Sequence, residues 1–568
     1  MTYSKLDNNV VISSHPIPYE VRVSLNKRFP PITSYIEINS LRQKGLISAI
    51  SSIRKIRANN LLVFVDDLEQ TPYLDILLVL SFLVPSSQRL LIFSNAPPNY
   101  ISVSVFLKSL LSLIVSIFSA LNHLLLSYIE IYSLTRRLKK TTHISFKNKT
   151  NIIYLNTNQM VGVKAGGSIG HITGVINAFN KVDWEVIYVG THDLEQLEHG
   201  VVFKRLKTKP LPPVFSDAAR FGFGHAAASQ VSQLLNDSSG TFIYQRMSRC
   251  DFSGVKLKFK HGVPLVLEYN GSEAWGSRHW GVKMCFEGLA LKAEGLSIRA
   301  ADLVVTVSDV LADELLKKGV DKSRIVVYPN CVDSNKFDPN RHKEKEKANL
   351  RKDYGINAGD FVFGFIGTFG FWHGIDFLCG AIRELVDTQR EWLDSKNIKF
   401  LLVGDGHFGH SVKMLIDDPN IAKYVVWTGI VEQEQAPKFL AMMDVFLSPH
   451  VQNPDGSKFF GSPTKLFEFM SMRRPIIASN LEQIGLVLSP SIHASELDQF
   501  QDRCMLNKNA ILFKPESRDE FLRALIFIEA NRHVGEYIAK NARKKVLKKY
   551  RWSHHVNSII NKIKEYSF

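Results

Sequence analysis

The stretch FVFGFIGTFGFWHGIDFLCGAIREL, residues 361–385, places a strand, a glycine-rich turn and a helix in direct succession. Phe361–Ile366 is an uncharged apolar run, which predicts a fully buried strand. The turn Gly367–Gly374 follows it directly. The residues after the turn place apolar side chains at helical spacing, namely Ile375, Leu378, Ile382 and Leu385. The segment is therefore predicted to be a strand–turn–helix unit of a parallel sheet.

The same alternation of strand and helix extends in both directions from this stretch. Before it, strands are predicted at Ile152–Leu155, Val186–Val189, Leu265–Glu268, Leu303–Val307 and Ile325–Tyr328. After it, strands are predicted at Phe400–Val403, Val425–Thr428, Val445–Ser448 and Ile476–Ser479. The charged segment Arg341–Lys352 separates the two series and is predicted to be a linker or an exposed helix. Two doubly wound α/β domains are expected, with ligands bound where their strand ends face each other.

The composition limits the partners and the compartment. The formal net charge of +16 suits an anionic partner such as nucleic acid, anionic lipid or a phosphorylated substrate, although it also describes a generally basic surface. No zinc-finger or ribonucleoprotein motif is present, so nucleic acid is not expected. The five cysteines lie far apart without a C-x-x-C pair, which argues against a metal site or disulfide framework and fits a reducing compartment. The polar N-terminus does not resemble a secretory signal.

The first 150 residues form a separate region. Leu61–Val65, followed by Asp66 and Asp67, and Leu90–Phe93 predict two strands, so residues 1–100 are expected to be a small α/β extension. Residues 101–150 are expected to form an apolar helix and a basic linker. The run Ser109–Ile129 carries no formal charge and is long enough to span a bilayer.

A weakly polar stripe along this apolar helix bears on how it would meet a membrane. Such a stripe can pack on protein while the other faces meet lipid, and it consists of Ser109, Ser112, Ser116, Ser119 and His123. The basic residues that follow place that end on the cytoplasmic side, and they are Arg136, Arg137, Lys139 and Lys140. A single span would put residues 1–100 outside the cytoplasm, where nothing in them looks secreted. We therefore predict a monotopic or re-entrant anchor, with a buried core helix as the alternative.

Two glycine-containing turns are candidate phosphate sites. Ala165, Gly166, Gly167 and Ser168 follow the first strand of the first series, and a helix follows them with Ile169, Ile172, Val175, Ile176 and Phe179 on one face. Paired glycines let backbone N–H groups approach a phosphate at a helix N-terminus, although they also close ordinary turns. Gly367 and Thr368 begin the corresponding turn of the second domain. His373, at the end of that turn, is predicted to make a polar contact with the ligand.

The segment GSPTKLFEFM, residues 461–470, is the most informative motif. Ser462 is predicted to be the N-cap of a helix and Pro463 its first residue, with Thr464 next. The helix N-terminus then favours an anion, and Lys465 adds a full positive charge. Glu468 is three residues further along the same face. We predict a cation for a diphosphate beside a carboxylate for ribose hydroxyls, with a surface ion pair as the alternative.

Together these motifs resemble the family-four retaining glycosyltransferases over roughly residues 151–560. The resemblance is carried, in chain order, by ADLVVTVS at 301–308, IVVYPNCVDSNKF at 325–337, GTFGFWHG at 367–374, LLVGDG at 401–406 and SPTKLFEFM at 462–470. It implies the GT-B fold, with two Rossmann-like domains facing a cleft. It also implies transfer of a sugar from a nucleotide donor with retention at the anomeric carbon and without a bound metal. Glu468 would contact the donor ribose, and Gly166 and Gly167 its diphosphate.

Three departures from the family pattern involve four positions. The first acid of the family's E-x₇-E motif is Phe460 here, its R-x₄-K pair falls on Thr368 and His373, and the glycine of its PNGVD segment is Cys331. The first two changes remove charges expected near the donor sugar and diphosphate. Lys465 and His373 are the candidates to supply the missing positive charge. Alternatively, the chain binds a donor without catalysing transfer.

The sequence thus predicts a retaining hexosyltransferase at the cytoplasmic face of a membrane, in polysaccharide or glycoconjugate biosynthesis. Its partners would be a nucleotide-sugar, which is the substrate and the only small molecule required, a lipid-linked or other glycan acceptor, and an anionic membrane surface. Predicted donor-binding residues are Gly166, Gly167, Gly367, Thr368, Ser462, Thr464 and Glu468. Lys465 and His373 are predicted to be catalytic, and Glu268 to contact the acceptor or to have a structural role; no metal ligand is predicted.

The predicted domain bounds are 151–340 for the acceptor domain and 341–535 for the donor domain, followed by a basic helix over 536–568. That helix carries a cluster suited to anionic lipid or simply to solvent, namely Lys540, Arg543, Lys544, Lys545, Lys548 and Lys549. Two other functions stay open. One is a nucleotide-sugar epimerase of the GT-B fold, and the other is a non-catalytic degenerate transferase that acts as a scaffold.

Overall fold

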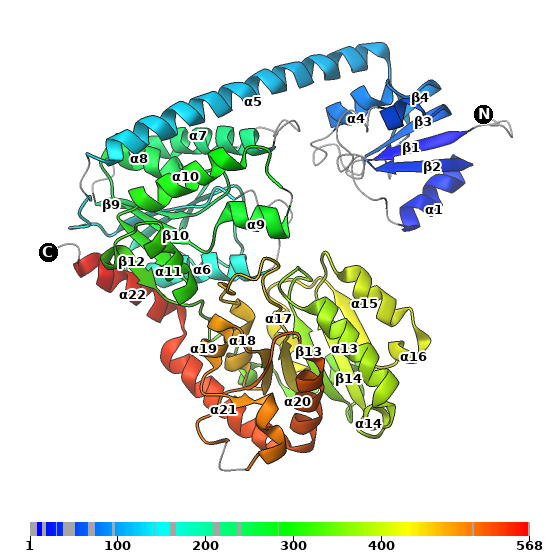
Figure 1. Ribbon diagram of the computed structural model, residues 1–568, viewed down its shortest axis with the longest axis vertical. Coiled ribbons are helices and arrows are strands. Elements are labelled where there is room, and N and C mark those ends of the chain that lie inside the picture. The colour runs from blue at the N-terminus through cyan, green and yellow to red at the C-terminus, as the bar shows by residue number, and fades with distance from the viewer. Residues whose placement is uncertain are drawn as a thin grey trace. The chain divides into compact units, whose positions relative to one another are not determined.

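The computed structural model of the chain (Figure 1) describes residues 8–13, 17, 19–29, 31–37, 51–65, 74–93, 97–140, 143–158, 166–207, 216–235, 240–281, 283–501 and 505–565. These residues form two compact units. The first comprises Met1–Ser133 with Thr208–Ala226, and the second comprises Leu134–Lys207 with Ala227–Phe568. The predicted residues Asp66, Asp67 and Ala165 lie outside the described residues. The boundaries predicted between domains stay predictions.

The first unit contains a five-stranded α/β sheet in the order β2-β1-β3-β4-β5. Its strands are β1 (Asn9–Ser13), β2 (Ile32–Glu37), β3 (Ala58–Val65), β4 (Ser86–Phe93) and β5 (Asn99–Tyr100), and all neighbours pair in parallel except β4 and β5. Alternate residues of β3 face opposite cores, because successive side chains of a strand point to opposite faces. Val63 packs in one core with Leu77 of α4 (Leu74–Ser81), and Leu62 packs in the other with Leu25 of α1 (Tyr19–Arg28). The small α/β extension and its two predicted strands are confirmed, whereas β1 and β2 were not predicted.

The apolar helix of the first unit is α5 (Val103–Leu138), 36 residues long. Its most apolar window has a mean hydropathy of 2.0, and only 17% of that window is buried. The exposed side chains include Leu107, Leu111, Val115, Phe118 and Leu125. The alternative of a buried core helix is therefore wrong, because a core helix does not leave most of its apolar surface exposed.

The predicted polar stripe of α5 is the side that packs on protein. Ser112 Oγ donates a hydrogen bond of 2.6 Å to Asp75 Oδ2 of α4. Ser127 Oγ lies 2.8 Å from His225 Nε2, which belongs to the part of α7 (Ser216–Leu234) within the same unit. A Cβ added at Gly222 of α7 would lie 2.6 Å from the ring of His123, so glycine permits this close approach. Ser112 and Ser127 of α5 thus have polar partners in the protein, while Leu107, Leu111 and Phe118 are exposed.

The second unit contains two seven-stranded sheets in which every neighbouring pair is parallel. The first has the order β12-β11-β10-β9-β6-β7-β8. Its strands are β6 (Asn151–Leu155), β7 (Glu185–Gly190), β8 (Val202–Arg205), β9 (Thr241–Arg246), β10 (Leu265–Tyr269), β11 (Leu303–Thr306) and β12 (Ile325–Val327). Its helices are α6 (Gly167–Asn180), α8 (Ser253–His261), α9 (Glu273–Trp280), α10 (Glu287–Ala300) and α11 (Asp309–Lys317). All five predicted strands are present, and β8 and β9 were missed.

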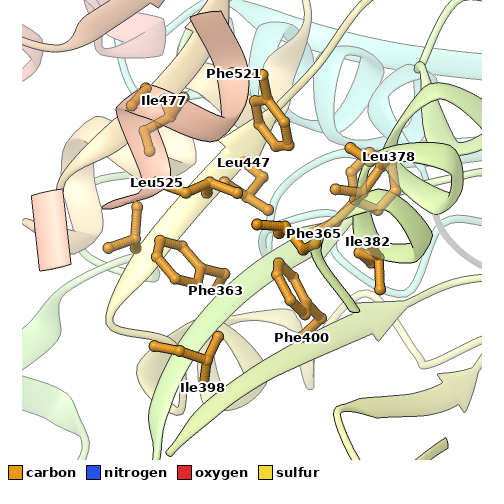
Figure 2. Close-up of a cluster of buried hydrophobic side chains, with 14 of the residues drawn as sticks. Phe363, Phe365, Leu378, Ile382, Ile398, Phe400, Leu447, Ile477, Phe521 and Leu525 are labelled. Carbon is orange, nitrogen blue, oxygen red and sulfur yellow. The ribbon is translucent and has the colours of Figure 1, made fainter. Parts of the chain in front are cut away.

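The second sheet has the order β15-β14-β13-β16-β17-β19-β18. Its strands are β13 (Phe361–Ile366), β14 (Ile398–Val403), β15 (Val425–Gly429), β16 (Val445–Ser448), β17 (Ile476–Ser479), β18 (Ile492–His493) and β19 (Ile511–Phe513). Its helices are α13 (Ile375–Thr388), α14 (Arg390–Ser395), α15 (Gly409–Ile416), α16 (Pro419–Ala422), α17 (Ala436–Ala441), α18 (Thr464–Met472), α19 (Glu482–Leu488) and α20 (Arg518–Ala530). Figure 2 shows the core on one face, where Phe363 and Phe400 of the sheet meet Leu378 of α13 and Leu525 of α20. The charged segment before β13 forms the helix α12 (Glu344–Asp353). Of the two predictions for this segment, a linker or an exposed helix, the helix is confirmed.

The C-terminal segment departs from the prediction of one basic helix. It forms α21 (Arg532–Lys549) and α22 (Trp552–Glu565), and α22 packs on α6 of the first sheet. Gly174 of α6 makes room for Trp552, since a Cβ there would lie 2.2 Å from the indole ring. Lys545 Nζ of α21 donates to the carbonyl oxygen of Val487 at 2.7 Å. At least one residue of the predicted basic cluster, Lys545, therefore makes hydrogen bonds within the protein.

Candidate functional site

Each seven-stranded sheet has a point where the strand order reverses. In the second sheet β13 lies between β14 and β16, so the loops that leave β13 and β16 diverge at their carboxyl ends. Doubly wound sheets bind ligands in the crevice outside such a switch point. The loop Gly367–Gly374 follows β13, and Pro449–Phe460 follows β16. The candidate site is therefore expected at these loops and at the N-terminus of α18.

The N-termini of α6 and α18 meet across the two sheet domains of the second unit. A Cβ added at Gly167 would lie 2.7 Å from Oγ1 of Thr464, so glycine allows the two helix ends to approach. Gly166, with a φ of 132°, donates its backbone N–H to Gln433 Oε1 at 2.9 Å. Because both helix N-termini carry unpaired N–H groups and partial positive charge, their meeting point favours an anion. The structure thus brings Gly166, Gly167 and Thr464 together as predicted.

Ser462 does not cap α18, which corrects the prediction made for it. The helix begins at Thr464, with Pro463 as its N-cap and no side-chain capping bond. Ser462 Oγ instead accepts a hydrogen bond of 3.0 Å from the backbone N–H of Asn330, and its carbonyl oxygen accepts one from Asn330 Nδ2. A partner distant in the sequence was available to this hydroxyl, and a local pattern cannot show such a partner. Ser462 therefore joins the two sheet domains through the PNCVD segment.

Glu268, at the end of β10, has a carboxylate that four neighbouring side chains contact. Its carboxylate is 0% exposed and accepts from Arg246, from Tyr154 at 3.0 Å and from Asn270 at 2.6 Å. His171 Nε2 of α6 lies 3.0 Å from the same carboxylate. Burial alone would raise the pKa of Glu268, but His171 and Arg246 with these hydrogen bonds hold it well below its usual range. This arrangement supports a positioning role for Glu268 and not the direct acceptor contact that was considered, because its oxygens are already filled.

Lys465, in the first turn of α18, is a buried ammonium group without a hydrogen-bond partner among the described residues. Its side chain is 7% exposed, and Nζ lies 4.2 Å from the centre of the Phe365 ring. A Cβ at Gly367 would lie 3.0 Å from Nζ, so the glycine turn and the lysine are immediate neighbours. Burial lowers the pKa of Lys465 to about 7, although Glu468 opposes the shift. Burial raises the pKa of Glu468 to about 7, although Lys336 and Lys465 oppose it.

His373 is buried in the loop after β13. Its Nδ1 contacts the carbonyl oxygen of the exposed Thr368. Burial, Lys465 and His450 together hold the pKa of His373 well below its usual range, despite the opposing contact with Thr368. The imidazole therefore favours its neutral form in the empty site, and its role as a source of positive charge stays a prediction.

His450, just after β16, is a site residue that the sequence reasoning missed. It is 0% exposed, and its ring centre lies 5.5 Å from that of His373. Its Nδ1 lies 3.0 Å from Ser448 Oγ, and its Nε2 has no hydrogen-bond partner. The only sequence signal was its position at the end of a predicted strand, which is where a doubly wound sheet places ligand contacts.

A pocket of about 670 Å³ lies within the second sheet domain, and its lining includes chain neighbours of the two histidines but not the histidines themselves. It is lined by the loop after β13, by Val451, by Phe408 and by the segment that enters α20; the lining residues are Gly370, Phe371, Gly374, Ile375, Asp376, Phe377, Phe408, Val451, Glu516 and Arg518. Gly370 and Gly374 flank His373 in the chain, and Val451 follows His450. The pocket volume lies within the range of small-molecule sites.

Phe460, which replaces an acid of the family pattern, belongs to an aromatic cluster between the two sheet domains. Its ring centre lies 5.1 Å from that of Trp275 and 5.6 Å from that of Trp280, both on α9. Trp372 of the loop after β13 lies 4.4 Å from Trp280. Trp275 Nε1 donates to Asp455 Oδ2 at 2.7 Å. Where the family pattern has an acid, this chain therefore has an aromatic ring that packs against the other sheet domain.

Comparison with known families and structures assigns this architecture. The family model described as Glycosyltransferase Family 4 matches residues 165–336, and the model described as Glycosyl transferases group 1 matches residues 360–531. The chain belongs to the family-four glycosyltransferases. The family resemblance inferred from the sequence motifs is confirmed.

Relatives of the transferase act in glycolipid and polysaccharide synthesis. The alpha-galactosylglucosyldiacylglycerol synthase of Streptococcus pneumoniae is 23% identical over 43% of this chain and 59% of its own length. The UDP-Gal:alpha-D-GlcNAc-diphosphoundecaprenol alpha-1,3-galactosyltransferase of Escherichia coli is 23% identical over 62% of this chain and 85% of its own length. The chain spans about three fifths of the length of the first curated relatives it matches, at 58% and 59%.

Solved structures confirm the GT-B fold of the transferase. HepE of Anabaena, solved in complex with UDP-glucose, has a TM-score of 0.53 and 18% sequence identity, and the match covers 73% of this chain and 99% of that one. At this identity the match shows the fold alone. The predicted roles of individual residues, the absence of a bound metal and the retention of configuration stay predictions.

Proposed function

We propose that the chain transfers a sugar from a nucleotide-sugar donor, with retention of configuration, to a lipid-linked or otherwise membrane-bound glycan. The observation that carries this proposal is the meeting of two helix N-termini with a buried, unpaired lysine. Gly166 and Gly167 lie at one helix end, and Thr464 and Lys465 at the other. Such a concentration of donors and positive charge suits the diphosphate of the donor.

The proposed chemistry breaks the bond between the anomeric carbon and the diphosphate oxygen. The acceptor oxygen forms a new bond to that carbon on the same face, and its hydroxyl proton passes to the departing diphosphate. Negative charge develops on the departing diphosphate. Lys465 and the two helix N-termini stabilise this charge without a metal ion, because prearranged donors in a dry site are worth far more than in water. Glu468 accepts from the ribose hydroxyls. Among the described residues no cluster of His, Cys, Asp and Glu is arranged to hold a metal.

The membrane-bound acceptor is supported by two relatives and by α5. The named products or acceptors of those relatives are a diacylglycerol glycolipid and a diphosphoundecaprenol sugar. Each apolar side chain of α5 that leaves water contributes roughly 1.5–3 kcal/mol. Because the polar stripe of α5 packs on α4 and α7, we propose that α5 lies in the membrane interface rather than crossing it. Arg136 and Arg137 at its C-terminal end suit anionic headgroups of the cytoplasmic leaflet.

A panel of nucleotide-sugars tests the catalytic proposal. UDP-, GDP-, ADP- and dTDP-sugars are titrated against the full chain, and the melting temperature is recorded, because a ligand selective for the native state raises it by mass action. The stabilising donor is then incubated with short-chain GlcNAc-diphosphoundecaprenol, and transfer of labelled sugar is measured. The proposal fails if no donor stabilises the protein. Isomerisation of the donor without acceptor would favour an epimerase, and binding without turnover on any acceptor would favour a scaffold.

Vesicle flotation tests the membrane proposal separately. The full chain should float with vesicles of phosphatidylcholine and phosphatidylglycerol at low and at high salt. Replacing Leu111, Phe118 and Leu125 with serine should leave at most a salt-sensitive fraction, because surface attraction is screened over a Debye length. The matched control replaces Met414 and Leu486, exposed apolar residues of α15 and α19, with serine. Equal flotation of the α5 variant and the control at high salt would reject α5 as the anchor.

A further inference from the structure

Three basic side chains converge at the switch point of the second sheet from three separate segments. His373 comes from the loop after β13, His450 from the end of β16, and Lys465 from the first turn of α18. Each is at least nine-tenths buried, with exposures of 9%, 0% and 7%. Nothing in the local sequence of any one segment indicates the other two. The cluster is therefore a product of the tertiary fold.

Two of the three side chains keep a buried nitrogen without a hydrogen-bond partner. These atoms are Nε2 of His450 and Nζ of Lys465. An unsatisfied buried donor costs about 1–3 kcal/mol, so native proteins rarely retain one without a use. Ser448 contacts Nδ1 of His450 at 3.0 Å and thereby leaves the other ring nitrogen open. Both open atoms are suited to an anionic oxygen.

The charged groups around this cluster leave it poor in negative charge. Lys465 and His450 face His373, and Lys465 faces His450. Glu468 faces Lys465, and Lys336 in turn faces Glu468. Burial and the neighbouring Lys465 hold the pKa of His450 well below its usual range, although the contact with Ser448 opposes them. His450 thus favours its neutral form in the empty site, and Lys465, with a pKa of about 7, is mostly neutral at pH 8.

We propose that His373, His450 and Lys465 form an anion pocket that takes up a proton from solvent when a nucleoside diphosphate binds, with Lys465 and His450 as the acceptors of that proton. The inference rests on the proposed function and names a residue for the donor site that the motifs do not include. A diphosphate beside His450 favours the imidazolium form, because an opposite charge within a few ångströms stabilises the charged state. Rising pH then weakens binding, and the proton returns to solvent when the nucleoside diphosphate leaves.

Isothermal titration calorimetry with UDP, GDP and ADP tests the inference on the full chain. Each titration is performed at pH 8 in buffers of different ionisation enthalpy. The observed enthalpy should vary linearly with buffer ionisation enthalpy, with a slope of about one proton taken up per nucleotide. His450→Gln and Lys465→Met should each reduce the slope, because each removes one of the two groups that can accept the proton. His410→Gln, an exposed histidine of α15, is the matched control and should leave the slope unchanged.

The possible outcomes separate the inference from the proposed function. If a nucleotide binds and the slope is zero, the inference is wrong while the proposed function stands. An unchanged slope in His450→Gln, or loss of the slope only in Glu468→Gln, would also overturn it by assigning the proton to another group. If no nucleotide binds to the folded wild-type chain, the proposed function itself fails. A melting scan of His450→Gln confirms that the variant is folded before its slope is interpreted.

Discussion

The second unit contains two buried ionisable centres that differ in one respect. Around Glu268, a fully buried carboxylate is contacted by His171, Arg246, Tyr154 and Asn270. Around Lys465, a buried ammonium group has no hydrogen-bond partner, and Glu468 acts on it only over a longer distance. Both centres lie at the carboxyl ends of parallel strands. The Glu268 carboxylate has its partners within the protein, whereas the Lys465 ammonium group has no hydrogen-bond partner among the described residues.

This difference distinguishes a structural centre from a binding centre. A buried charge is tolerated when its partners compensate the loss of water. The Glu268 centre meets that condition, and it is linked through His171, Asn330 and Ser462 to the second sheet domain, with His171 Nδ1 lying 2.6 Å from Asn330 Oδ1. The Lys465 centre leaves the cost unmet until an anion arrives. Perturbed buried groups in a crevice are therefore better functional candidates when they lack partners than when they have them.

The largest expected effect comes from breaking the Glu268 centre. Glu268→Gln keeps the shape of the side chain but leaves Arg246 buried without its counter-charge, and such losses cost about 3–5 kcal/mol of unfolding free energy. Denaturant unfolding measures the loss. The control Glu287→Gln removes one partner of the surface pair with Arg278 and should cost about 0–1 kcal/mol. Equal losses in both variants would contradict the structural role of Glu268.

Removing Lys465 should lower turnover strongly and leave the unfolding free energy unchanged or higher, the opposite of the result expected for Glu268. Lys465→Ala is expected to lower turnover about 10²–10³-fold, because one prearranged donor to developing charge is lost. Its unfolding free energy should be unchanged or higher, since an uncompensated buried charge disappears. Turnover and melting temperature are measured together, with Lys458→Ala, an exposed lysine of the preceding loop, as the control. Near-normal turnover would show that Lys465 is not the group that stabilises the charge of the departing diphosphate.

A smaller effect is expected from Glu468→Gln. Hydrogen bonds to a charged group are worth about 1.5–3 kcal/mol, so loss of the carboxylate should weaken donor binding about tenfold or more. Titration calorimetry with the stabilising nucleotide-sugar measures it. Glu434→Gln, a nearby carboxylate outside the donor residues, serves as the comparison. An affinity equal to that of the wild type would falsify the assignment of Glu468 to the ribose.

The smallest effect concerns pH. Glu468 has a raised pKa of about 7 in the fold, so the stability it contributes is present below pH 4.5 and is lost as pH rises to 7. Lys465 has a lowered pKa of about 7, so the stability that its burial removes is regained as pH rises from 7 towards 10.5. The pair should produce a minimum of the unfolding free energy near pH 7. Chemical unfolding across this range should show the minimum in the wild type and a flatter curve in Lys465→Met with Glu468→Gln.

Periodicity in the sequence determined the architecture of the second unit. All ten strands predicted in the two series are present, because fully buried parallel strands produce uninterrupted apolar runs and their helices show one apolar face. The missed strands are those whose runs are short or mixed, such as β8 (Val202–Arg205) and β18 (Ile492–His493). The apolar run of α5 likewise indicated its length and composition. These features depend on residues that are close in the chain.

Only the tertiary structure decided which polar groups are satisfied. Serine is a favoured N-cap residue, but the hydroxyl of Ser462 accepts a hydrogen bond from the backbone N–H of Asn330 in the other sheet domain. Glu268 and Lys465 are each a charged residue at the edge of a sheet, and nothing local indicates that one is paired and the other is not. The sequence also could not show that the polar stripe of α5 faces protein and leaves its apolar faces exposed. Hydrogen-bond partners and burial depend on contacts between segments far apart in the chain, and a local pattern carries no information about them.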